Sequence, residues 1–170
     1  MTGTEPVVRD AGPDDVAAVR RFGEEHVPAH YTPLIGAEAA AGQVRLWWDE
    51  ARLGAAAADG LLVVAELDGQ LVGVAQRGHL GTDHVVYKLY VHPALRGRGL
   101  GPRLLDAITR RLPADADRLW IEHYAANARA GAFYEREGFT VQRVEPGPTG
   151  DPALAVVWRA RPLRRPASAR

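Results

Sequence analysis

A glycine-rich turn between a predicted strand and a predicted helix carries the clearest chemical signal in this sequence. The segment 96–101 reads R-G-R-G-L-G and follows an apolar, alternating stretch at 84–91. Glycines let the backbone fold closely around a ligand, and the unpaired N–H groups at a helix start attract an anion. The nearby Arg96, Arg98 and Arg103 favour a pyrophosphate site. The alternative is a tight turn whose glycines serve packing.

Two known phosphate motifs are excluded for this turn. No G-K-[ST] follows it, as the Walker motif requires, and Gly97, Gly99 and Gly101 are spaced G-x-G-x-G rather than G-x-G-x-x-G. A nucleotide-phosphate site of another kind is a further hypothesis for the same glycines.

A second set of polar side chains surrounds the next predicted strand and helix. Glu122 lies on the strand predicted at 118–123, Asn127 follows it, and Tyr134 lies on the helix predicted at 128–137. From the residues alone, Glu122 is interpreted as a strand-face carboxylate paired with an arginine or with Lys88, and Tyr134 as a core aromatic on an apolar helix.

The elements that position these residues alternate between strand-like and helix-like patterns, which predicts an α/β or α+β architecture. Prolines at 28 and 33 predict a break after the first helix, and Val44, Trp47, Trp48 and Ala51 predict one apolar stripe on a second helix that ends at Gly54. Asp68-Gly69 predicts a two-residue hairpin turn. Strands are predicted at 7–11, 61–67, 70–76, 84–91, 118–123, 139–144 and 153–158, and further helices at about 16–22, 99–112 and 128–137.

Composition narrows the class of protein. The 170 residues contain no cysteine, which excludes a disulfide framework and thiolate chemistry and fits a cytoplasmic location. No stretch has the length and apolarity of a signal peptide or a membrane helix. The formal net charge is zero, but Arg159–Arg170 holds five arginines and no acid. We therefore expect a domain at 1–160 that binds neither nucleic acid nor membranes, followed by a basic, disordered tail at 161–170.

The two motifs together resemble the GNAT superfamily of acetyl-CoA-dependent N-acetyltransferases. Its signature R/Q-x-x-G-x-G/A matches residues 96–101, and strand L-W-I-E followed by Asn127 and Tyr134 matches a second family element. The resemblance covers nearly the whole chain outside the tail. It implies a mixed, mostly antiparallel sheet of about seven strands flanked by about four helices, with a V-shaped split between the fourth and fifth strands.

The resemblance also implies roles for individual residues. Backbone groups of Leu89, Tyr90 and Val91 would bind the pantetheine arm and the thioester carbonyl, and Asn127 would bond the pantetheine or the following loop. Tyr134 would protonate the departing thiolate. The amides of the turn would bind the pyrophosphate; these belong to Arg96, Gly97, Arg98, Gly99, Leu100 and Gly101.

The sequence indicates the general base less clearly than it indicates the residues that would bind the donor. Many members of the superfamily carry a glutamate on the fourth strand, but residues 84–92 hold no carboxylate. Glu122 matches the position of the base in the ribosomal-protein N-terminal acetyltransferases of the superfamily. His84, His123 or a water relay are the alternatives.

Other aromatic and histidine residues have simpler interpretations. Trp47 and Trp48 are expected in the core, although in this superfamily the first two helices also border the acceptor pocket. His26 and His30 have metal-like spacing, but Pro28 lies between them and no third ligand is evident, so we expect no metal.

The resulting hypothesis is an N-acetyltransferase in which an amine attacks acetyl-CoA directly in a ternary complex. The acceptor would be a polyamine, an aminoglycoside-like amine or a peptide N-terminus, and the protein could assemble as a homodimer. The alternative is a non-catalytic acyl-CoA-binding sensor or scaffold of the same fold.

Overall fold

A mixed sheet of seven strands forms the centre of the fold. A computed structural model describes residues 4–163, and the strands lie in the order β1-β2-β3-β4-β5-β7-β6. The strands are β1 (Val7–Asp10), β2 (Leu62–Leu67), β3 (Gln70–Leu80), β4 (Asp83–Val91), β5 (Arg118–Tyr124), β6 (Thr140–Glu145) and β7 (Val156–Pro162). The α-helices among the described residues are α1 (Val16–Ile35), α2 (Ala37–Trp47), α3 (Glu50–Ala58), α4 (Leu100–Arg110) and α5 (Ala128–Arg136).

Strand pairing confirms the predicted fold class. The pairs β1–β2, β2–β3, β5–β7 and β6–β7 are antiparallel, whereas β4 and β5 are parallel. A parallel pair needs a long crossover, and the segment containing α4 supplies it. The β4–β5 pairing covers only His84–Val86 and Leu119–Ile121, so most of β4 lies beyond the paired stretch.

The hairpin between β2 and β3 forms where it was predicted. Asp68 and Gly69 both have positive φ, at 50° and 79°, which is the geometry of a type I′ turn. Asparagine, aspartate and glycine tolerate this conformation best, which explains why the dipeptide is a dependable signal.

The chain packs as two compact units. Of the described residues, the first unit comprises 4–76 and 88–110 and the second comprises 77–87 and 111–163, so that β3 and β4 each contribute to both. The prediction of a single domain at 1–160 remains a prediction.

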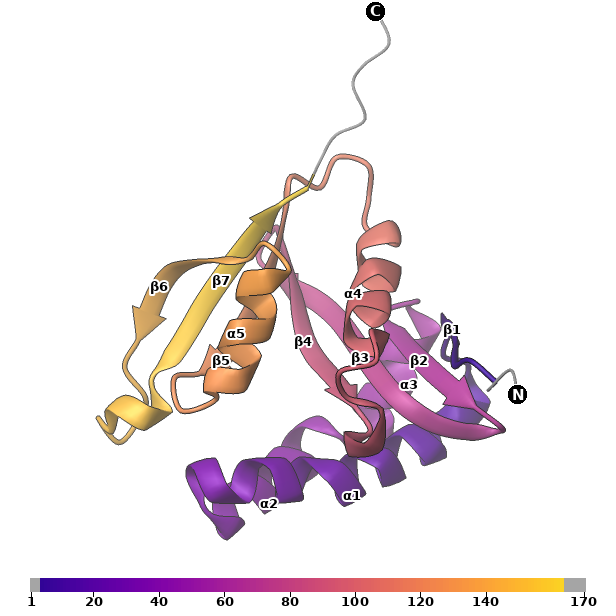
Figure 1. Cartoon of the computed structure of the whole chain (residues 1–170), viewed down its shortest axis with the longest axis horizontal. Helices are drawn as coiled ribbons and strands as arrows, with labels where there is room; N and C mark the ends of the chain where they lie inside the picture. The colour runs from indigo at the N-terminus through magenta and orange to yellow at the C-terminus, as the bar shows by residue number, and fades with distance from the viewer. Residues whose placement is uncertain (1–3, 164–170) are drawn as a thin grey trace, which may run out of the picture. The chain divides into compact units, whose positions relative to one another are not determined.

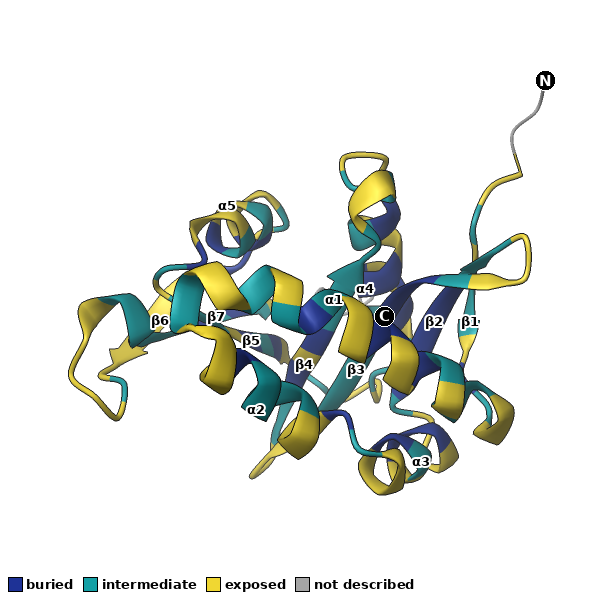
Figure 2. Ribbon diagram, turned by 90° about the horizontal axis from the view of Figure 1, so that it is seen from below, coloured by how far each residue is buried: buried dark blue, intermediate teal, exposed yellow. Residues whose placement is uncertain are grey.

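Alternation along β2 gives the first unit an apolar layer on each face of its sheet. Leu62 and Val64 join a buried cluster with residues of α1 and α3, including Phe22 and Leu53. Next to Val64, Ala65 faces the other way, toward Gly73 of β3 and Leu104 of α4. In Figure 2 most of β2 is dark blue, because its first four residues are buried. Helices α1 and α2 run side by side (Figure 1).

The predicted break at the two prolines is wrong. Helix α1 continues through Pro28 and Pro33 to Ile35. Each proline removes a backbone donor, but Val19, Phe22 and Val27 are buried, so tertiary packing outweighs the local cost. Thr32 adds a bond from its hydroxyl to the Pro28 carbonyl, at 2.6 Å.

The single apolar helix predicted around Trp47 and Trp48 is also wrong. Asp49 caps a new helix, α3, by accepting a bond from the Arg52 amide, and this helix runs through Gly54. Because the chain turns between α2 and α3, Trp48 is buried at 2% exposure while Trp47 is exposed at 51%. The core prediction therefore holds for Trp48 only.

The second unit packs α5 against one face of β5 and β7. Figure 1 draws α5 across these strands, and its Tyr134 contacts His123 of β5 and Phe139. Gly131 permits the close approach, because a Cβ there would lie 3.1 Å from the His123 ring. Strand β6, by contrast, is exposed along its length.

The C-terminal boundary differs from the prediction. Strand β7 continues through Pro162, and the Leu163 amide donates to the Asp117 carbonyl at 2.8 Å. Arg161 and Pro162, assigned above to a disordered tail, therefore belong to the sheet, because β7 pairs with β5 over its whole length. The rest of the predicted tail, 164–170, lies outside the described residues. Within residues 4–163, no helix is long and apolar enough to cross a membrane.

Candidate active site

The glycine turn lies at the start of α4 in the first unit. Gly97 and Gly99 have φ values of 74° and 79°, which other residues rarely adopt. A Cβ at either position would meet no heavy atom within 4 Å. A glycine that is needed for close packing would have neighbouring atoms where its Cβ would lie. Gly97 and Gly99 have none there, so the packing alternative is disfavoured. The turn instead leaves open space beside its backbone.

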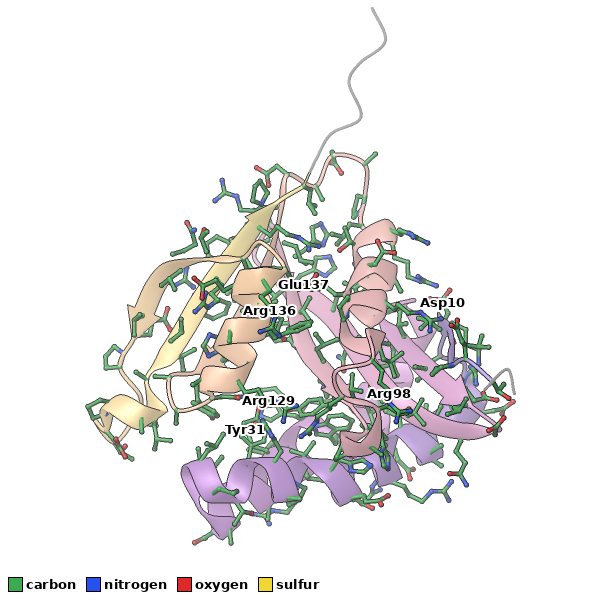
Figure 3. The ribbon with its side chains drawn as sticks, in the orientation of Figure 1. Asp10, Tyr31, Arg98, Arg129, Arg136 and Glu137 are labelled. Carbon is green, nitrogen blue, oxygen red and sulfur yellow. The ribbon has the colours of Figure 1, made fainter. Side chains whose placement is uncertain are left out.

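Helix α4 adds donors to this turn. It begins at Leu100, so the amides of Leu100 and Gly101 have no acceptor within the helix, and the N-terminal end of the helix dipole favours an anion there. Arg98 is exposed on the turn, where Figure 3 labels it. Arg103 has a structural role as well, since it donates to the Pro6 carbonyl at 2.7 Å.

Strand β4 brings Leu89, Tyr90 and Val91 directly before this turn. The Tyr90 phenol lies 3.1 Å from the Tyr31 phenol of α1, and its ring packs edge-on against Trp48. The backbone beyond the strand is fixed by a bond from the His92 amide to the Val72 carbonyl, at 2.8 Å. The first unit thus contains both backbone segments of the predicted acyl-donor site, joined by residues 92–95.

His92 and His26 lie at the same end of β4. The His92 side chain accepts from the Ala94 amide at 3.1 Å, and the His26 ring packs against it edge-on at 4.9 Å. Burial lowers the pKa of His26, which favours its neutral form. No cluster of three or more metal-ligating side chains is found in residues 4–163.

The second unit contains Asn127, Tyr134 and Glu122. Asn127 is 7% exposed and caps α5, because its side chain accepts from the Ala130 amide at 3.2 Å. Tyr134 is 8% exposed and stacks on the His123 ring at 6.3 Å between centroids. Tyr134 is therefore part of the core, as the alternative interpretation held, and this position is compatible with a chemical role.

Glu122 and Tyr134 lie on opposite faces of β5. Tyr134 contacts His123, and neighbouring residues of a strand point to opposite faces, so Glu122 points away from α5. On that face its cross-strand partner is Trp158, which in turn pairs with Arg143 of β6. A base that deprotonates an attacking amine and an acid that protonates a leaving thiolate act on different atoms, so they need not share a face.

The surroundings of Glu122 favour its protonated form. Its side chain reaches solvent, but nearby protein atoms remove part of its water and raise its pKa; the carboxylate of Glu145 raises it further, and Arg143 opposes the effect. No ion pair of Glu122 is found among the described residues, because Arg143 pairs with Glu145 at 2.8 Å. The residues that the structure describes thus offer no ion-pair partner for Glu122, and its role stays a prediction.

The histidine alternatives are less suited to accept a proton. His123 donates through Nδ1 to the Tyr124 carbonyl at 2.9 Å and accepts at Nε2 from Arg159 at 3.1 Å, so both ring nitrogens are engaged. Burial lowers the pKa of His123 and of His84. The Nδ1 atom of His84 is buried without a partner among the described residues.

Lys88 of β4 is a residue whose position the sequence analysis missed. It is the sole lysine of the chain and is 7% exposed. Its Nζ donates to the Gln76 side chain at 2.7 Å and lies 5.3 Å from the centre of the Trp48 ring. Burial lowers the pKa of Lys88 to about 8. The strand pattern held a signal, because Lys88 alternates in register with the inward-pointing Val86.

Comparisons with known proteins identify the superfamily. Residues 58–141, which contain both motifs, match the sequence profile described as "Acetyltransferase (GNAT) domain". The chain belongs to the GNAT acetyltransferase superfamily. A GCN5-related N-acetyltransferase from Rhodopseudomonas palustris is 25% identical, with a TM-score of 0.75 and 96% of this chain and 99% of that chain covered.

Two further N-acetyltransferase structures share the fold at lower identity. The PaiA N-acetyltransferase of Thermoplasma acidophilum, in complex with coenzyme A, is 15% identical with a TM-score of 0.78, covering 93% of this chain and 99% of that one. The ribosomal-protein-S18-alanine N-acetyltransferase of Escherichia coli is 20% identical with a TM-score of 0.61, covering 97% and 98%. The matched profile over residues 58–141 makes the protein an acyltransferase of the GNAT type, which confirms the sequence-based assignment, and these two structures add the shared fold.

Proposed function

We propose that the protein transfers the acetyl group of acetyl-CoA to a primary amine by direct attack. The observation that carries this proposal is the R-G-R-G-L-G turn at the start of α4, where Gly97 and Gly99 leave open space beside the backbone and the amides of Leu100 and Gly101 have no acceptor within the helix. A polyanionic donor such as acetyl-CoA explains it, since the amides at the start of α4 can bind a pyrophosphate. The coenzyme A bound to the Thermoplasma acidophilum relative supports the same donor.

In this proposal the backbone of Leu89–Val91 binds the thioester. A backbone N–H near Val91 stabilises the oxyanion as the amine attacks the carbonyl carbon. The C–N bond forms, the C–S bond breaks, and Tyr134 gives its proton to the departing thiolate. Asn127 keeps α5 in place through its cap, in addition to the contact with the pantetheine that the family resemblance implies.

Glu122 is the proposed base. An alkylammonium must lose a proton before it can attack, and a carboxylate with a raised pKa is better matched to that transfer than an ordinary one. The bonding of His123 and the buried Nδ1 of His84 favour Glu122 over either histidine.

Calorimetric titration tests the donor. We expect acetyl-CoA to bind and ATP and NADH to bind at least tenfold more weakly. Equal or tighter binding of ATP would favour a nucleotide-phosphate site and would contradict the proposal.

The cytoplasmic location, the homodimer and the absence of a metal remain predictions.

A further inference from the structure

Lys88 is a buried cation that the proposed reaction does not use. Its side chain leaves β4 one residue before Leu89, at the start of the segment proposed to bind the thioester. An ammonium group has three donor hydrogens, and Gln76 accepts one of them. The Trp48 ring attracts the charge through its face but supplies no lone pair.

No carboxylate neutralises Lys88 in the part of the chain that the structure describes. The acidic group that acts on it most strongly is Asp49, and this carboxylate is already engaged. Asp49 caps α3 through the Arg52 amide and pairs with the Arg52 guanidinium at 3.0 Å, so Arg52 offsets its charge. A buried charge without a counter-ion is costly, and a ligand carboxylate would remove that cost.

Aromatic rings surround the same face of β4. Tyr90, two residues after Lys88, packs against Trp48 and lies within hydrogen-bond distance of Tyr31 through the two phenols. Tyr31 and Tyr90 are only half-buried. Figure 3 labels Tyr31 on α1. Ligand sites combine apolar and aromatic side chains with a few polar or charged groups, and a desolvated ammonium beside these rings fits a small organic anion.

We propose that Lys88 binds a carboxylate of the acceptor, so that the protein acetylates amines of the amino-acid type rather than polyamines. This inference rests on the proposed function, because the acceptor is the amine of that reaction. Trp48 and Tyr90 form the apolar wall of the carboxylate site, and Gln76 holds the Lys88 ammonium in place.

The first test measures the protonation of Lys88 directly and does not require turnover. Because the chain has one lysine, protein grown with [ε-13C]lysine gives one lysine signal, whose pH titration follows Lys88 alone. The probes are free amino acids and the same amino acids as carboxamides. We expect at least one free amino acid to raise the pKa of Lys88 from about 8, and its carboxamide to leave it unchanged. If no free amino acid moves the titration, the inference is overturned.

The second test measures acetylation of the same pairs by release of thiol. We expect KM to be about tenfold lower for a free amino acid than for its carboxamide, with similar kcat. The reason is that one hydrogen bond between charged groups strengthens binding by about this factor. Lys88→Met should remove the difference, and Lys88→Arg, which keeps the charge, should retain part of it. Circular dichroism shows whether each variant folds.

The outcomes separate the inference from the proposed function. Equal KM values for acids and carboxamides in the wild-type protein would overturn the carboxylate site while leaving amine acetylation intact. Absence of any acetylation would contradict the proposed function, and the 13C titration would still decide whether a carboxylate binds at Lys88.

Discussion

At the residue scale, the sequence indicates residues that have fixed places in a motif. It does not indicate residues whose environment depends on neighbours far away in the chain. Motif spacing indicated Gly97, Gly99, Asn127 and Tyr134 as candidates, because each has a fixed place in a family motif, and their roles stay predictions. The environment of Lys88 depends on Gln76 and Trp48, which are distant in the sequence. Local pattern contains no information about such a pairing.

Tyr134 is the residue whose substitution tests acid catalysis. Tyr134→Phe keeps the ring and therefore its packing against His123 and Phe139. We expect turnover to fall on the order of tenfold or more, because the thiolate loses its proton donor, while affinity for acetyl-CoA changes little. Steady-state kinetics and calorimetry on the same preparation measure both. Unchanged turnover would remove Tyr134 from the mechanism.

Glu122 should control the acidic side of the pH profile. A base acts in its deprotonated form, so kcat/KM should rise with pH through the pKa of Glu122, and this pKa lies above the ordinary glutamate value. In Glu122→Gln we expect a lower rate and no such rise. The control is Glu145→Gln, which removes the neighbouring carboxylate and should move the rise to lower pH. A wild-type profile retained in Glu122→Gln would exclude Glu122 as the base.

At the element scale, sequence pattern predicted strands better than helices. Each predicted strand exists, with ends that shift by a few residues, because alternation and turn residues are local signals. The helices of the first unit depend on packing instead. Because Val19 and Phe22 are buried, α1 continues through its prolines. The Asp49 cap begins a new helix where the pattern had predicted a single apolar one.

The glycine turn can be tested against a matched glycine elsewhere. Gly99→Ala forces a left-handed φ on alanine, which costs about 1 kcal/mol, and disturbs the donors before α4. Gly81→Ala imposes the same strain at φ 62° with equally open surroundings. We expect thermal denaturation to detect similar destabilisation in both variants, and calorimetry to detect weaker acetyl-CoA binding only in Gly99→Ala. Equal donor affinity in the two variants would contradict the pyrophosphate assignment.

An ion cluster joins β1, β2 and the start of α1. Arg9 donates to Asp15 at 2.8 Å and to Glu66 at 2.7 Å, and Asp15 also accepts from the Gly12 amide. The bond from Arg9 lowers the pKa of Asp15, so this stabilisation is present above the unfolded-state pKa and is lost as pH falls through the lower folded-state value.

Asp15→Asn should therefore destabilise the protein near neutral pH. We expect a loss of about 1 kcal/mol in the free energy of unfolding, since the cluster is partly exposed, and a smaller loss in strong acid. Urea denaturation at several pH values measures the difference. Asp14→Asn, next to it and exposed, is the control and should have little effect. A loss in Asp15→Asn that did not depend on pH would contradict the ion-pair account.

At the scale of the whole molecule, the order of elements and two motifs were enough to predict the superfamily. The seven strands with one parallel pair and the matched profile over residues 58–141 agree with that prediction. The acceptor could not be predicted in the same way. Net charge is a sum over the chain, whereas acceptor choice depends on single groups such as Lys88, whose partners Gln76 and Trp48 meet it only in the folded chain.

The proposed transfer of an acetyl group from acetyl-CoA to an amine can be detected through its products. The purified protein is incubated with acetyl-CoA and a broad panel of amines, including peptides, polyamines and amino acids, and products are identified by mass spectrometry. We expect at least one acetylated amine, formed together with free thiol and strongly reduced with Tyr134→Phe. Tight acetyl-CoA binding with no acetylated product anywhere in the panel would contradict it and would favour a non-catalytic acyl-CoA sensor.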